Sequence, residues 1–96
     1  MKLIILDRDG VINVNHGYVC TINDFDFIDG IFDLVSTATE LDYLVIVITN
    51  QAGIARGFYS EEDFHTLNEW MCSKFELIGA NIDRVYFSPF HPTEGL

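Results

Sequence analysis

The sequence contains few basic residues, few prolines and no long aliphatic run. Its 5 Lys and Arg residues stand against 15 Asp and Glu, a formal net charge of -10, so most of its surface would repel the dense phosphates of a nucleic acid. The longest aliphatic run, residues 44–48, is only five residues, whereas a membrane-spanning helix needs roughly 18. We therefore expect neither nucleic acid nor a membrane as a partner.

Cysteine is also scarce. Cys20 and Cys72 lie far apart without metal-ligand spacing, and two thiols do not form a disulfide framework. The apolar run after Lys2 is too short for a secretory signal, and no lipidation motif is present. These features predict free thiols and a cytoplasmic location. Because 49% of the residues are hydrophobic, we expect a folded domain and not a disordered chain.

Three apolar segments alternate with two helical patterns. Residues 3–6 are uninterrupted aliphatics, typical of a strand buried on both faces of a parallel sheet, and residues 43–48 and 85–87 are also predicted strands. Apolar residues recur every three or four positions in 31–41 and 60–78, and the second segment opens with a serine and three acids. This order predicts an α/β fold with a Rossmann-like parallel sheet.

The segment between the first strand and the first helix, residues 11–29, is mixed and rich in Asn, Asp and Gly. Its alternating Asp-Phe-Asp-Phe at 24–27 favours either a loop or a small flap of short strands. We expect this excursion to be too polar to join the core.

Two carboxylates, Asp7 and Asp9, follow the first predicted strand. Ligands of open α/β sheets bind at the carboxyl ends of strands, and paired carboxylates there favour a divalent cation with oxygen ligands, such as Mg²⁺. One carboxylate could attack a phosphoryl group while the other transfers protons. The alternative interpretation is a solvated strand exit, where Asp is common.

Thr49 and Asn50 occupy the equivalent position one strand later. A hydroxyl and exposed backbone N–H groups at such a strand end can hold the oxygens of a phosphate. A Thr at a strand end is common. Thr49 and Asn50 therefore indicate a phosphate site only together with the two carboxylates that follow the first strand.

Longer strings carry a family resemblance. Residues 7–13 read Asp-Arg-Asp-Gly-Val-Ile-Asn, residues 15–18 read Asn-His-Gly-Tyr, and residues 49–57 read Thr-Asn-Gln-Ala-Gly-Ile-Ala-Arg-Gly. They resemble the first two motifs of haloacid dehalogenase (HAD) superfamily phosphatases, in the branch that acts on D-glycero-D-manno-heptose 1,7-bisphosphate or histidinol phosphate. The resemblance implies a HAD-like fold and Mg²⁺-dependent phosphomonoester hydrolysis, with a small sugar phosphate as substrate and an aspartyl-phosphate intermediate.

The resemblance also implies roles for single residues. Asp7 would be the nucleophile and a Mg²⁺ ligand, and Asp9 would be the general acid/base and offer Mg²⁺ its backbone carbonyl. Arg56, one of three arginines, suits a substrate phosphate or, equally, a surface ion pair. Without its place in the 15–18 motif, His16 would be interpreted as a surface histidine. The residues expected to hold the phosphoryl group or contact the substrate are Asn15, His16, Gly17, Tyr18, Thr49, Asn50, Gln51 and Ala52.

One departure concerns zinc. The heptose phosphatases open a zinc-binding loop with Cys-Pro-His-His-Pro, where residues 88–92 here read Ser-Pro-Phe-His-Pro. Ser88 and Phe90 cannot replace a thiolate and an imidazole. We therefore expect no zinc, which leaves heptose phosphates, other sugar phosphates and histidinol phosphate open as substrates.

The second departure is length, since family members continue beyond the position of Leu96. Residues 1–96 are therefore expected to be the N-terminal part of one HAD-like domain that is incomplete at its C-terminus, without the basic residue and acids that complete the family's site. The strand at 3–6 would then be an edge and could mediate self-association. A catalytically incomplete fragment or pseudoenzyme that binds phosphate or a partner is thus a second hypothesis. A phosphoacceptor receiver domain is a third, although it would need an Asp where Thr49 or Ser88 stands.

Overall fold

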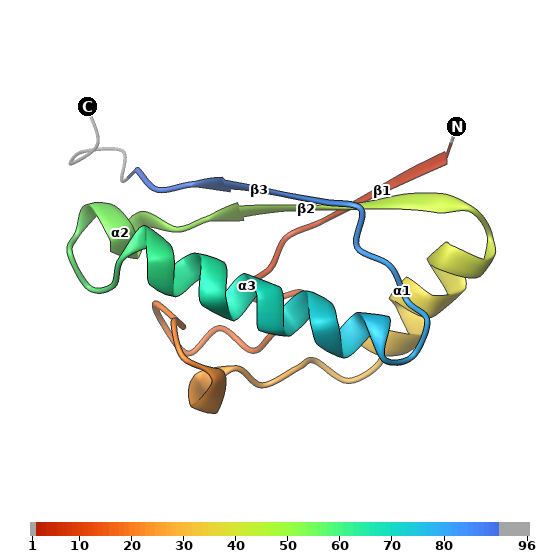
Figure 1. Ribbon diagram of the computed structural model, residues 1–96, viewed down its shortest axis with the longest axis horizontal. Coiled ribbons are helices and arrows are strands. Elements are labelled where there is room, and N and C mark those ends of the chain that lie inside the picture. The colour runs from red at the N-terminus through yellow and green to blue at the C-terminus, as the bar shows by residue number, and fades with distance from the viewer. Residues whose placement is uncertain (1, 91–96) are drawn as a thin grey trace.

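Three parallel strands form the sheet of this computed structural model, which describes residues 2–90 (Figure 1). β1 (Lys2–Leu6) pairs with the central strand β2 (Tyr43–Asn50), which pairs with β3 (Arg84–Ser88). The expected Rossmann-like parallel α/β sheet is confirmed. The remaining elements are a 3₁₀ turn and three helices: η1 (Ile22–Asp24), α1 (Ile31–Glu40), α2 (Ala52–Ala55) and α3 (Glu61–Glu76).

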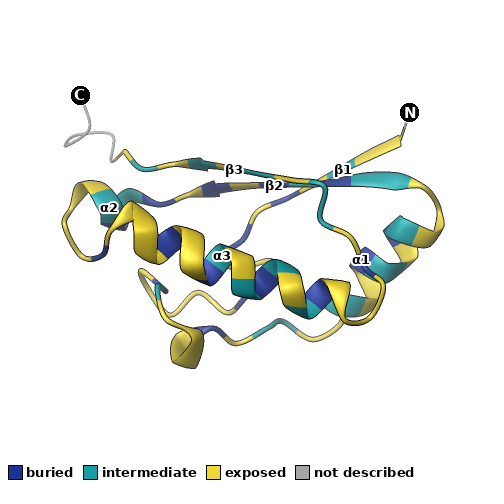
Figure 2. Cartoon of the chain, in the orientation of Figure 1, coloured by how far each residue is buried: buried dark blue, intermediate teal, exposed yellow. Residues whose placement is uncertain are grey.

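Both long helices lie on the same side of the sheet (Figure 1). The N-terminus of α3 has the predicted cap: Ser60 Oγ accepts from the Asp63 N–H at 3.0 Å, and the Asp63 carboxylate accepts from the Ser60 N–H at 2.9 Å. The buried residues of α3 recur every three or four positions (Figure 2). This buried stripe consists of Phe64, Leu67, Met71 and Phe75. The last three belong to the same core cluster as Val45 and Val47 of β2, and Phe64 stacks on Phe87 of β3.

The prediction that β1 is buried on both faces was wrong for the described part of the chain. Leu3 and Ile5 are exposed, whereas Leu6 is buried. Successive side chains of a strand point to opposite faces, and the described helices cover only one of them. As the length argument predicted, β1 is an edge strand of the described sheet.

The excursion at 11–29 was also misjudged, because Ile12, Val19 and Phe25 are buried members of the core. The Asp-Phe alternation turns its aromatic rings inward, and Phe25 meets Trp70 edge-on with ring centroids 5.5 Å apart. Within the excursion the described backbone forms η1 and isolated bridges, including Asn13↔Phe27, in place of short strands. It is therefore a loop that completes the core.

Cys20 and Cys72 are free thiols, as expected, and burial is the main cause that raises the pKa of each. Among residues 2–90, no helix has both the length and the apolar character that crossing a membrane requires.

Candidate active site

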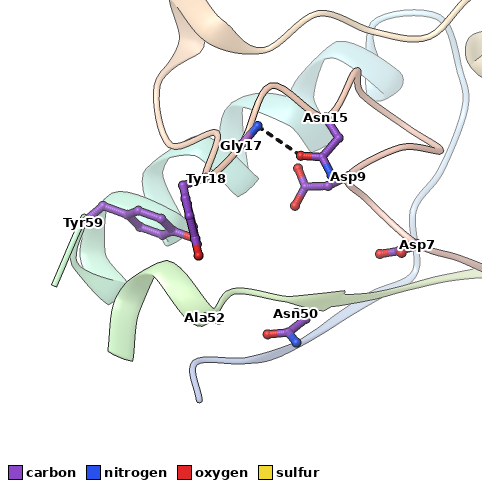
Figure 3. A pocket seen from close by; sticks show the side chains of 8 residues that line it. All are labelled: Asp7, Asp9, Asn15, Gly17, Tyr18, Asn50, Ala52 and Tyr59. Carbon is purple, nitrogen blue, oxygen red and sulfur yellow. Dashed lines mark hydrogen bonds between the residues drawn. The ribbon is translucent and has the colours of Figure 1, made fainter. Parts of the chain in front are cut away.

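A cavity of about 370 Å³ opens where the chain leaves β1 and β2 (Figure 3). The β1–β2 pairing runs from Lys2↔Tyr43 to Leu6↔Val47, so Asp7 leaves β1 beside the last residues of β2. Asp7, Asp9 and Asn50 lie around one part of the cavity, and Tyr18 and Tyr59 lie around the other. The lining residues are Asp7, Asp9, Asn15, Gly17, Tyr18, Asn50, Ala52 and Tyr59.

A tight turn after β1 presents both carboxylates. The Asp7 Oδ1 accepts from the Arg8 N–H at 2.8 Å. The backbone then reverses, with the Ile12 N–H donating to the Arg8 carbonyl at 2.8 Å and the Gly10 N–H donating to the Asn13 carbonyl at 2.7 Å. Gly10 has φ of +93°, a conformation that residues with a Cβ rarely adopt. This turn places Asp7 and Asp9 on the same cavity.

The Asp9 carboxylate is fixed by several donors. Its Oδ1 accepts from Arg8 Nη2 at 2.9 Å, Arg8 Nε at 3.3 Å and Asn13 Nδ2 at 3.0 Å. Arg8 is itself buried, and its Nη2 also donates to the Val19 carbonyl at 3.0 Å. The guanidinium therefore offsets the charge of Asp9 and ties the site to the excursion.

Four residues expected at the site lie outside the cavity lining. Thr49 and Gln51 are buried. The exposed His16 ring is 2.7 Å from the Asp26 carboxylate within the excursion, and the exposed Arg56 caps the C-terminus of α2. The other expected contacts, Asn15, Gly17, Tyr18, Asn50 and Ala52, do line the cavity.

Sequence reasoning missed Tyr59, which lines the cavity and is buried. Burial is the main cause that raises its pKa to about 12, so the phenol is a hydrogen-bond donor at neutral pH. The hydroxyl donates to Gln51 Oε1. No motif pointed to Tyr59; its place just before the Ser60 cap is the one sequence signal available.

Gly53 brings two cavity residues together. An added Cβ would lie 2.3 Å from Tyr59 Cε1 and 2.9 Å from Tyr18 Cδ1. Real Cβ atoms do not approach carbon this closely, so only glycine fits between these rings.

The donor set at the cavity is chemically suited to Mg²⁺. Asp7, Asp9 and Asn50 supply hard oxygen atoms, and Mg²⁺ is usually held by one or two carboxylates, with water and substrate phosphate completing its shell. Asp7 and Asp9 are only two carboxylates, and within residues 2–90 no group of three or more His, Cys, Asp or Glu side chains is arranged to hold a metal ion. His91 and Pro92 of the segment compared with the zinc loop lie outside the described residues.

Comparison with known proteins gives close sequence relatives, although no family model matches the chain. A D-glycero-alpha-D-manno-heptose-1,7-bisphosphate 7-phosphatase from Burkholderia mallei is 56% identical over 95 residues, which are 99% of this chain and 50% of that protein. A D-glycero-beta-D-manno-heptose-1,7-bisphosphate 7-phosphatase from Vibrio cholerae is 46% identical over 93 residues, 97% of this chain and 50% of that protein. The chain thus spans about half the length of these curated relatives.

Solved structures agree with the sequence relatives. The D,D-heptose 1,7-bisphosphate phosphatase of B. bronchiseptica, crystallised with magnesium and phosphate, matches with a TM-score of 0.93 and 31% identity over 100% of this chain and 54% of that chain. The corresponding phosphatase of Burkholderia thailandensis matches with a TM-score of 0.70 and 32% identity, over 91% and 52% of the two chains.

A putative HAD-like phosphatase from Mesorhizobium loti also matches, with a TM-score of 0.87 and 30% identity over 97% of this chain and 44% of that chain. The fold is thus similar to that of HAD-like phosphatases, which confirms the resemblance expected from the sequence. Within that class, the chain is similar to the heptose-1,7-bisphosphate phosphatases over about half of their length.

Proposed function

We propose that this chain contributes the nucleophile and the proton-transfer group of a phosphatase that hydrolyses a small sugar phosphate similar to D-glycero-D-manno-heptose 1,7-bisphosphate. The observation that carries the proposal is the convergence of Asp7, Asp9 and Asn50 on one cavity at the strand ends. The names of the relatives support the substrate class.

In the proposed reaction, an Asp7 oxygen attacks phosphorus and the bond from phosphorus to the sugar oxygen breaks. Asp9, which enters this step protonated, gives its proton to that leaving oxygen and becomes a carboxylate. Asp9 then takes a proton from water, which attacks the aspartyl-phosphate, and the bond between phosphorus and Asp7 breaks to release inorganic phosphate. Mg²⁺ held by the Asp7 carboxylate and the Asp9 carbonyl would offset the charge of the phosphoryl group.

The test measures phosphate release from heptose 1,7-bisphosphate and from histidinol phosphate, with Mg²⁺ and after chelation. We expect release from the heptose compound, loss of release with EDTA, and a fall of more than about a thousandfold in Asp7→Asn, because the attacking oxygen loses its charge. Asp33→Asn, the same change on an exposed position of α1, is the matched control.

Each alternative has its own outcome. Preferential release from histidinol phosphate would reassign the substrate. Release that survives Asp7→Asn would exclude the proposed nucleophile. Phosphate binding without release would favour the catalytically incomplete fragment.

A further inference from the structure

Gln51 stands at the junction of β2 and α2, between the cavity residues Asn50 and Ala52, and only 1% of it is exposed. Its carboxamide contacts three polar side chains. Nε2 donates to Thr49 Oγ1 at 2.9 Å and lies 3.5 Å from Asp9 Oδ2, the outer limit of a hydrogen bond, while Oε1 accepts from the Tyr59 hydroxyl. A side chain so enclosed has little surface left for a substrate.

The contacts also fix which way the carboxamide points. Because an ionised Asp9 carboxylate can only accept, the end of the carboxamide that faces Asp9 and Thr49 is the NH₂ group, and the oxygen faces the Tyr59 hydroxyl. An amide that donates into Thr49 Oγ1 leaves the hydroxyl hydrogen of Thr49 to point elsewhere. Thr49 thus accepts from Gln51, and both side chains are buried.

Asp9 is held from two sides by the same arrangement. Arg8 and Asn13 occupy its Oδ1, and Gln51 approaches its Oδ2. Hydrogen bonds of catalytic groups are often long before a ligand binds and shorten in the complex. Gln51 is thus the buried group that touches both Asp9 and Thr49.

We propose that Gln51, held by Tyr59, is a positioning residue that aligns the Asp9 carboxylate with the Thr49 hydroxyl, and that it does not contact the substrate. This inference rests on the proposed phosphatase function and deepens it. It replaces the sequence-based interpretation of Gln51 as a substrate contact.

Steady-state kinetics on heptose 1,7-bisphosphate separates the two roles. Loss of positioning lowers kcat and leaves KM nearly unchanged, whereas loss of a ground-state contact raises KM. For Gln51→Met, which has a similar size and cannot donate to Asp9 or Thr49, we expect kcat to fall about tenfold to a hundredfold, with KM changed by less than about twofold. A raised KM with unchanged kcat would overturn the proposal.

Tyr59→Phe is the milder variant, because it keeps the ring that packs on Gly53 and removes only the hydroxyl. We expect kcat to fall in this variant too, but by less than in the Gln51 variant. The double variant should lose less than the product of the two single effects, since Tyr59 acts through Gln51; a full product would overturn that link. Asn23→Leu, which also removes a carboxamide, and Tyr86→Phe, which also removes a phenol hydroxyl, serve as controls away from the cavity.

A second readout does not need turnover. Gln51 is the only glutamine of the chain, so its side-chain NH₂ signals can be identified in ¹⁵N NMR spectra. We expect slow hydrogen exchange and signals that shift in Tyr59→Phe and Asp9→Asn but not in Tyr86→Phe. Exchange as fast as that of an exposed amide, or signals insensitive to both variants, would overturn the placement of Gln51.

The two failures are distinguishable. A wild-type chain that releases no phosphate contradicts the proposed function, while the NMR signals still decide whether Gln51 holds Asp9 and Thr49.

Discussion

The two faces of the sheet are similar in composition and opposite in environment. On the face that packs against the helices, Val45 and Val47 are fully buried. On the other face, Ile5 is 56% exposed, Ile48 50% and Tyr86 56%. Neighbouring residues of β2 thus differ in burial without differing in hydrophobicity. Burial is decided by which layer packs on a face, and parallel sheets in folded proteins are usually covered on both.

The largest expected loss of unfolding free energy comes from a substitution between the helices and the covered face of the sheet. Phe75 is buried, and its ring centroid is 4.7 Å from that of Phe32 and 5.7 Å from that of Phe27. Phe75→Ala should lower the free energy of unfolding by about 3–5 kcal/mol, because it removes buried apolar surface and leaves a cavity. Urea unfolding followed by circular dichroism measures this loss. A loss below about 1 kcal/mol would contradict the described packing.

A matched pair on β2 compares the faces directly. Val47→Ala should cost about 2 kcal/mol of unfolding free energy, since two buried methyl groups are lost. Ile48→Ala removes more atoms from the exposed face and should cost less than about 1 kcal/mol. Equal losses in the same urea experiment would mean that another layer covers the second face in solution.

Tyr59, on the covered side of the sheet, makes the free energy of unfolding depend on pH. Its pKa is raised from 10.0 to about 12 by burial, so the folded state holds this proton more tightly than the unfolded state. Stability from this group is therefore intact below pH 10 and declines as the pH rises toward about 12. Unfolding measured at several pH values should show a shallower decline in Tyr59→Phe; identical slopes would contradict the raised pKa.

The smallest expected effect lies on the uncovered face. Ile5→Lys, on the edge strand β1, should change the free energy of unfolding by less than about 0.5 kcal/mol, because the side chain is already in water. It should also reduce any self-association, since a charge on an edge strand opposes pairing with another chain. Sedimentation velocity measures the second effect. A loss above about 1 kcal/mol would show that this face is packed.

The sequence was sufficient for the elements that have strong local signals. Short apolar runs predicted the three strands, and the apolar spacing together with the Ser60 cap predicted the two long helices. The Asp7–Asp9 pair was located because parallel strands present their carboxyl ends at one edge. The apolar runs, the apolar spacing and the helix cap are all formed by residues close together in the sequence.

Tertiary contacts explain what could not be predicted. Phe25 and Val19 are buried because the excursion folds back onto α3 and Arg8, and no local pattern records that path. Tyr59 and Gln51 meet across a loop, so neither their hydrogen bond nor the burial of Gln51 has a signature in the sequence. The roles of the site residues remain predictions.

Gly53 sets a limit on how this site can change. With the Tyr18 and Tyr59 rings already against its backbone, even one added methyl group would push apart the excursion and the segment leading into α3. We therefore expect the shape of the cavity to change more readily through substitution of Tyr18 or Tyr59 than through substitution of Gly53. The absence of a side chain at position 53 is thus what allows both tyrosine rings to lie at the cavity.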